Sequence, residues 1–166
     1  YAGYSYEILS SIANSLENFV HPFFFEKETG KTLVVLITSN SGLCGGYNSQ
    51  VIKSVLNFLK ISNDEIEMVT VGKKGGMSMR RINQNITSVF TEIPDVNISL
   101  RDVSTLSKLI IDEYQNLKYK KVFIAYTHFL SALTQKPIIK QLLPISKEEI
   151  KENILGAKLR SNFSLG

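Results

Sequence analysis

The sequence predicts an α/β domain of three layers, with helices on both faces of a mostly parallel, five-stranded sheet. Apolar runs rich in β-branched residues alternate with stretches of helical periodicity, which is typical of strands joined by helical crossovers. The first run, Thr32–Thr38, is continuously apolar between its threonines, as in strands covered on both faces. A glycine-rich segment then separates this run from the next helical pattern, as a strand–loop–helix unit requires.

Five strands are expected, and the last two form a special case. The connection between them, His128 to Lys136, is too short for a helical crossover, so we expect these two strands to be antiparallel neighbours. An antiparallel edge strand is common on an otherwise parallel sheet. The expected strands are Thr32–Thr38, Glu67–Val71, Ile86–Phe90, Lys121–Tyr126 and Ile138–Ile145.

Apolar residues at helical spacing predict four helices. The first, from Tyr4 to Phe19, must end before Pro22 and has no N-cap signal, so we expect the chain to be a fragment of a longer protein. The second follows the glycine-rich segment, with Asn48 or Ser49 as its N-cap. A short third helix is expected near 77–82, a longer fourth one over 103–117, and charged residues 147–153 are compatible with another turn of helix.

The composition argues against several classes of protein. Among 166 residues there are 19 Lys and Arg and 15 Asp and Glu, interleaved along the chain, without the basic and aromatic stripe typical of nucleic-acid binding. The longest apolar stretch, Leu33–Ile37, is far too short to cross a bilayer. The single cysteine, Cys44, excludes an internal disulfide and favours a reducing, intracellular compartment. With only His21 and His128 besides, a structural zinc site is not expected.

The glycine-rich segment allows two interpretations. Its place between a strand and a helix favours anion binding by free backbone N–H groups. Its spacing fits neither a P-loop nor Gly-x-Gly-x-x-Gly, and Tyr47 stands where a P-loop has lysine. We therefore expect a tight structural turn that contacts no ligand, with at least one of its glycines at positive φ. The residues of this turn are Gly42, Cys44, Gly45, Gly46 and Asn48.

No catalytic residue, cofactor site or metal site is expected. Ser41 lies on a strand-to-helix turn, but the Gly-x-Ser-x-Gly pattern of a nucleophile elbow is absent. Cys44 could be a reactive thiol only if a histidine came close, and a lone cysteine in an apolar turn is more often a buried small hydrophobe. The acidic residues Asp64, Glu65 and Glu67 are interpreted as solvated surface.

The turn also carries a resemblance to a known family. Gly42-Leu-Cys-Gly-Gly46, followed by Asn48, resembles the segment after the first strand in gamma subunits of F-type ATP synthases. The sequence departs from the family pattern at Asn40 and Ser41, where Asp and Arg are usual. Three weaker matches occur in the family's order: Tyr1-Ala2 with the helix up to His21-Pro22, Val71–Gly75, and Gln135-Lys-Pro137 through Gln141-Leu-Leu-Pro144.

This resemblance implies a Rossmann-like domain together with part of an N-terminal shaft helix. The implied division is 1–21 for the end of that helix, 22–146 for the Rossmann-like domain and 147–166 for a charged, partly disordered tail. The implied function is that of a central rotor, which couples proton-driven rotation of the c-ring to ATP synthesis in the alpha/beta hexamer. Such a subunit has no catalytic residues and no cofactor of its own.

The resemblance also implies partners and a location. The partners are the epsilon subunit, the c-ring and the alpha and beta subunits, with the membrane reached only through the c-ring and no nucleic acid involved. The location is peripheral, on the cytoplasmic face of a bacterial inner membrane or its organellar equivalent. Two alternatives stay open: a nucleotide- or small-molecule-binding Rossmann-like enzyme domain, and a nucleic-acid-binding domain.

Overall fold

The structure, a computed structural model, describes residues 23, 26–41, 46–95, 99–131, 133–146, 148–149 and 152. The expected first helix, Tyr4 to Phe19, and the end of the expected tail, 153–166, lie outside these residues. The chain divides into two compact units, of which the larger spans Lys27–Leu142. In the smaller unit, the N–H of Ile145 donates to the carbonyl of Phe23 over 2.6 Å, and the described residues Glu148, Glu149 and Glu152 are helical.

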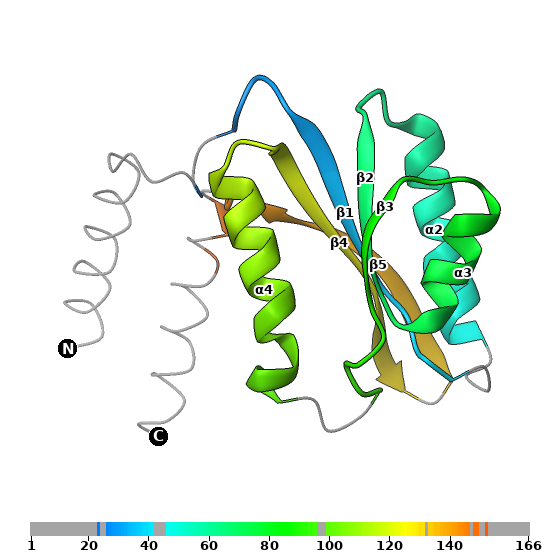
Figure 1. The fold of residues 1–166 in the computed structure, drawn as a ribbon. Helices are drawn as coiled ribbons and strands as arrows, with labels where there is room; N and C mark the ends of the chain where they lie inside the picture. The colour runs from blue at the N-terminus through cyan, green and yellow to red at the C-terminus, as the bar shows by residue number, and fades with distance from the viewer. Residues whose placement is uncertain are drawn as a thin grey trace, which may run out of the picture. The chain divides into compact units, whose positions relative to one another are not determined.

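The larger unit is built on a five-stranded sheet of order β3-β2-β1-β4-β5 (Figure 1). Strand β1 pairs in parallel with β2 on one side and β4 on the other, and β2 pairs in parallel with β3. This confirms the expected mostly parallel, five-stranded α/β fold. The strands are β1 (Lys31–Ile37), β2 (Ile66–Val71), β3 (Ile86–Phe90), β4 (Tyr119–Ser131) and β5 (Thr134–Leu143).

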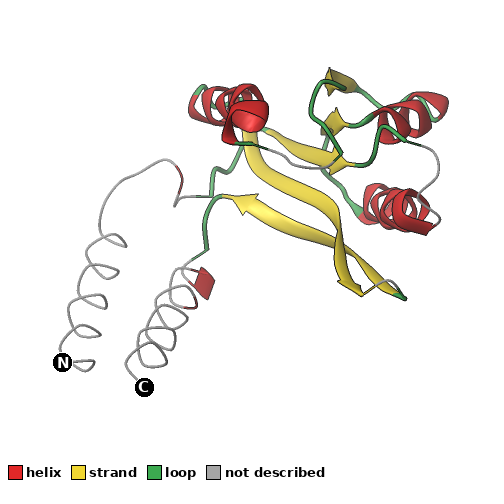
Figure 2. Cartoon of the chain, turned by 90° about the horizontal axis from the view of Figure 1, so that it is seen from below, coloured by secondary structure: helices red, strands yellow, loops and turns green. Residues whose placement is uncertain are grey.

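Strands β4 and β5 are much longer than the sequence suggested. Residues 128–136, expected as a connection, belong mostly to the strands themselves, and only 132 and 133 join them. Hydrogen-bonded neighbours joined by so short a link are antiparallel, and Figure 2 shows two long strands whose arrows run in opposite directions. Strand β5 contains Pro137 and lies at the edge of the sheet, which is the position in a sheet where proline is tolerated.

Three described helices complete the layers. Helices α2 (Gly46–Ile61) and α3 (Lys73–Arg81) cover one face of the sheet, and α4 (Leu100–Gln115) covers the opposite face (Figures 1 and 2). Helix α2 begins at Gly46, so Asn48 and Ser49 lie inside its first turn and the expected N-cap is wrong. Helix α3 begins four residues earlier than expected, because Gly75 and Gly76 pack inside it instead of forming a loop before it.

The core forms where alternate strand residues meet the helices. Val34 and Leu36 of β1 and Met68 of β2 are fully buried beneath α2 and α3, together with Val55 and Met79 of those helices. Both faces of β1 and β2 are buried over their middle residues, which explains the unbroken apolar runs in the sequence. Helix α4 buries Leu106, Ile110 and Tyr114 at helical spacing. Its N-terminus is closed by a capping box between Ser99 and Asp102.

Candidate functional site

The turn that the sequence singled out lies at the carboxyl end of β1. Of its five residues, Gly42, Cys44 and Gly45 lie outside the described part of the chain, while Gly46 and Asn48 are described. The Asn48 side chain accepts a hydrogen bond from the N–H of Ser39 at 3.0 Å and donates to Oγ of Ser39 at 2.7 Å. Asn48 therefore ties the first turn of α2 to the end of β1.

The first N–H groups of α3 are occupied by the protein's own oxygen atoms. The N–H of Lys73 donates to Oδ1 of Asn40 at 3.1 Å, and that of Gly75 donates to Oγ1 of Thr38 at 2.8 Å. The N–H of Lys74 donates to the carbonyl of Ser39 at 3.3 Å. These are the groups that would hold a phosphate at a helix N-terminus. Helix α3 thus offers no free anion cradle beside the turn.

Asn40 and Asp95 join the segments after β1 and β3. The carboxylate of Asp95 accepts from the backbone N–H of Asn40 at 2.9 Å and of Ser41 at 3.3 Å. The Asn40 amide also donates to the carbonyl of Ile93 at 3.2 Å. An aspartate at position 40, as is usual in the family that the sequence resembles, could accept from Lys73 but could not donate to Ile93. The asparagine therefore suits this network of contacts.

The glycine that the backbone geometry requires here is Gly72, which follows β2. It has φ +89°, and a Cβ at this position would lie 2.1 Å from the carbonyl oxygen of Thr38. Gly46, in contrast, is not at positive φ, and an added Cβ would meet the flexible side chain of Gln50 at 3.2 Å. The expectation of positive φ is thus not met at Gly46. No role for Gly72 was expected from the sequence, although a glycine directly after a buried strand was the available signal.

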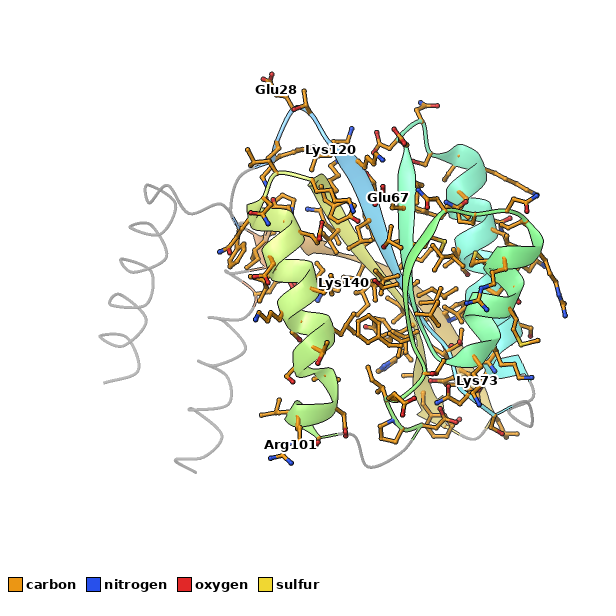
Figure 3. All side chains as sticks on the ribbon, viewed as in Figure 1. Glu28, Glu67, Lys73, Arg101, Lys120 and Lys140 are labelled. Atoms are coloured by element: carbon orange, nitrogen blue, oxygen red, sulfur yellow. The ribbon has the colours of Figure 1, made fainter. Side chains whose placement is uncertain are left out.

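A buried charged cluster lies at the other, amino-terminal end of the sheet. Figure 3 shows Glu67 and Lys120 toward this end and Lys73 toward the opposite one. Glu67, in β2, is only 4% exposed, so its interpretation as solvated surface was wrong. Its carboxylate accepts from Nζ of Lys31 at 2.8 Å and from the phenol of Tyr119 at 2.7 Å, and forms an ion pair with Lys118 at 3.3 Å. An acidic residue inside the apolar run of β2 was the signal for a buried, paired charge.

The same contacts set the charge states of this cluster. Burial alone would raise the pKa of Glu67, but hydrogen bonds from Lys31, Tyr119 and Lys118 outweigh it and lower the pKa below the ordinary value. Burial, followed by the hydrogen bond to Glu67, raises the pKa of Tyr119. The hydrogen bond to Glu67 also raises the pKa of Lys31. The cluster is therefore an ionised carboxylate surrounded by protonated donors at neutral pH.

Asp64 and Glu65 flank this cluster at the start of β2. The hydrogen bond from Lys120, at 2.7 Å, and a second one from Thr32 lower the pKa of Asp64. The Glu65 side chain is 71% exposed and pairs with Lys31 at 3.2 Å. Asp64 and Glu65 are thus partly or largely solvated, as expected from the sequence, whereas Glu67 is buried.

Within the described part of the chain, the contacts of the remaining candidates do not form a catalytic group. Ser41 is exposed, its N–H is bound by Asp95, and its carbonyl accepts from Oγ of Ser39. His128 is exposed on β4, while Cys44 and His21 lie outside the described residues. Among the described residues, no three potential metal ligands lie close enough together to hold an ion. The described helices include none that is long and apolar enough to span a bilayer.

Similarity to known sequences extends over almost the whole chain and points to one family. The family described as "ATP synthase" matches residues 1–164. The ATP synthase gamma chain of Legionella pneumophila (strain Corby) is 31% identical over 159 residues, which cover 94% of this chain and 55% of that protein. The gamma chain of Clostridium novyi (strain NT) is 33% identical over 130 residues, covering 78% of this chain and 45% of that protein. The chain thus spans about half the length of these curated relatives.

Solved structures with the same fold come from mitochondrial ATP synthases. The central stalk and c-ring of Tetrahymena thermophila include a chain that matches with TM-score 0.57 and 23% identity, over 86% of this chain and 69% of that one. The rotor of Euglena gracilis includes one with TM-score 0.55 and 17% identity, over 92% and 62%. At these identities the structures show a shared fold. Together with the family match and the gamma-chain relatives, the findings show that this chain belongs to the ATP synthase gamma-chain family.

Proposed function

We propose that this chain is the globular part of a central rotor subunit, which couples proton-driven rotation of the c-ring to ATP synthesis in the alpha/beta hexamer. The observation that carries the proposal is the family match over residues 1–164. Relatives named ATP synthase gamma chain cover 94% of the chain, and the similar structures are named as rotor and central stalk. These findings do not favour the alternative of a Rossmann-like enzyme.

The proposed role is mechanical, without chemistry in this subunit. The occupied N–H groups at the start of α3 are consistent with this role, because they leave no free donors for a phosphate at that helix N-terminus. The turn of Gly42, Cys44, Gly45, Gly46 and Asn48 then has a structural role, as the link from Asn48 to Ser39 suggests. No cofactor is needed for this role.

The proposed partners are the epsilon subunit, the c-ring and the alpha and beta subunits. The membrane would be reached through the c-ring, which places the subunit peripherally on the cytoplasmic face of a bacterial inner membrane or on its organellar equivalent. In this proposal residues 1–21 end a shaft helix, 22–146 form the domain that meets epsilon and the c-ring, and 147–166 form a charged tail. In this proposal rotation also needs shaft segments, which would lie in the part of the relatives' length that this chain does not cover.

Two experiments test this proposal on the 166-residue chain. The tagged chain is mixed with the epsilon subunit from the same source, and binding is measured by co-purification and calorimetry. The proposal predicts a one-to-one complex, and a folded chain that fails to bind epsilon removes the partner assignment. The same chain is then expressed in a strain that lacks gamma. It should not restore growth on a non-fermentable carbon source, and rescue by this chain alone would contradict the need for a full shaft.

A further inference from the structure

An unassigned cavity of about 590 Å³ opens at the carboxyl end of the sheet, within the larger unit. The strand order reverses at β1, with β2 on one side of it and β4 on the other. Open α/β sheets bind ligands at such a point, beyond the carboxyl ends of the strands, and the cavity lies there. Its volume is within the usual range for small-molecule sites. The lining residues come from six elements and two loops, and they include Thr38, Ser39, Asp95, Val103, Phe129 and Gln135.

The lining is mostly apolar, and several of its polar groups already have partners. The Thr38 hydroxyl donates to the carbonyl of Val71 at 3.2 Å and accepts from the N–H of Gly75 at 2.8 Å. The Ser39 hydroxyl donates to the carbonyl of Ser41 at 2.6 Å and accepts from Asn48 at 2.7 Å. The half-buried amide of Gln135 makes no hydrogen bond that the structure describes, so it remains able to orient a ligand.

The charges around the cavity select a class of ligand. Asp95 is the one charged side chain among the described lining residues, and neither lysine nor arginine is among them. The Asp95 oxygens accept only from backbone N–H groups, so their negative charge is not neutralised by a cation in the contacts described. A phosphate or carboxylate would be repelled by this negative charge, and the N–H groups at the start of α3 are already occupied.

We infer that this cavity binds a small, mainly apolar organic molecule that is uncharged or carries one positive charge, with a polar group directed at Gln135 and any cation at Asp95. The site is a binding site without chemistry, and it is independent of the rotor function. Phe129, on β4 and 60% exposed, also lines the cavity and supplies an aromatic surface for the apolar body.

The test uses three probes with one apolar body and different charges: 3-phenylpropan-1-amine, 3-phenylpropan-1-ol and 3-phenylpropanoate. Each is titrated into the ¹⁵N-labelled chain, and amide shifts are followed by NMR. The amine and the alcohol should bind with a Kd of about 1 mM, as expected for ligands of this size. The shifts should cluster at the ends of β1 and β2 and on α4, and the propanoate should bind at least about tenfold more weakly than the amine.

Variants test separately the location of the site in the cavity and the preference of Asp95 for a cation. Val103→Trp places an indole in the cavity and should abolish binding of the amine and the alcohol, whereas Thr105→Trp, at an exposed position of the same helix, should not. Asp95→Asn should reduce the preference for the amine over the alcohol by about threefold and leave alcohol binding intact. The inference is overturned if no probe binds, if shifts lie elsewhere, if Val103→Trp has no effect, or if the propanoate binds as well as the amine.

Discussion

The phenol of Tyr119 donates a hydrogen bond of 2.7 Å to Oε2 of the buried Glu67, across a sheet in which their strands are not neighbours. Strand β1 lies between them and contributes Lys31, which binds Oε1 of the same carboxylate at 2.8 Å. One carboxylate therefore links three parallel strands at their amino-terminal ends. A charge that is 4% exposed stays in the fold because each of its oxygens has a donor.

Removing the phenol should weaken the domain. In Tyr119→Phe, one oxygen of a buried carboxylate loses its 2.7 Å donor, and a hydrogen bond to a charged group contributes about 1.5–3 kcal/mol. We expect the free energy of unfolding in urea to fall by this amount. The control is Tyr126→Phe on the same strand, where the structure describes no hydrogen bond of the hydroxyl and a change within about 0.5 kcal/mol is expected. Equal losses in both variants would contradict this role of Tyr119.

The lowered pKa of Glu67 predicts a specific pH dependence. Since its pKa is below the ordinary 4.5 in the folded state, Glu67 stabilises the fold above about pH 4.5 and loses this effect as pH falls through the folded pKa. Glu67→Gln cannot titrate. The difference in unfolding free energy between the two proteins should be largest near neutral pH and shrink in acid. Urea titrations from pH 7 to pH 3 measure it, and a difference that is constant or grows in acid would show that Glu67 is not ionised in the cluster.

A pair of alanine substitutions tests which glycine the backbone requires. Gly72→Ala forces a Cβ against the carbonyl of Thr38 at a residue with φ +89°, so we expect a loss of about 2 kcal/mol or more. Gly46→Ala adds a methyl group at the first residue of α2 and should change stability by less than about 1 kcal/mol. Thermal and urea unfolding measure both. If Gly46→Ala lowered the free energy of unfolding more than Gly72→Ala, the backbone requirement for glycine would lie in the glycine-rich turn and not at Gly72.

Thr70 provides a test in which stability should rise. Its hydroxyl is buried in β2 and has no hydrogen-bond partner in the described structure. Thr70→Val removes this unpaired polar group at similar shape, and the free energy of unfolding should increase by about 0.5–1.5 kcal/mol. Thr38→Val is the matched variant, because the Thr38 hydroxyl both donates to Val71 and accepts from Gly75, and it should be destabilising. If both variants shift stability in the same direction, the assignment of their hydrogen bonds is wrong.

Much of the sheet could be predicted from the sequence, because its parallel strands are buried on both faces. The runs at 32–38, 67–71 and 86–90 differ from β1, β2 and β3 by at most one residue at either end. The extent of β4 and β5 could not be predicted in this way. Their outer parts are exposed and carry no alternating apolar pattern, and the two residues between the strands, Ala132 and Leu133, are neither the glycine nor the asparagine that marks most hairpins.

The contacts of Glu67 and of Asn40 were less predictable than the sheet, because the residues that make them are brought together only by the fold. Glu67 belongs to a charged run along the chain, and its donors Lys31 and Tyr119 come from strands 36 and 52 residues away. Asn40 and Asp95 are likewise 55 residues apart. The turn, in contrast, was recognisable because its glycines and Asn48 are close in sequence. Even there, the geometric requirement lies at Gly72, which the strand order places against Thr38.

The central claim, that this chain is part of a rotor, is tested most directly by proton pumping. A gamma chain from the same source is assembled with its alpha, beta and epsilon partners and the membrane sector, and compared with one lacking the segment that matches residues 1–164. ATP-driven acidification of the membrane vesicles is followed by fluorescence quenching. The account predicts pumping with the complete chain and ATP hydrolysis without pumping in an assembled complex that lacks the segment. Full pumping without residues 1–164 would contradict it.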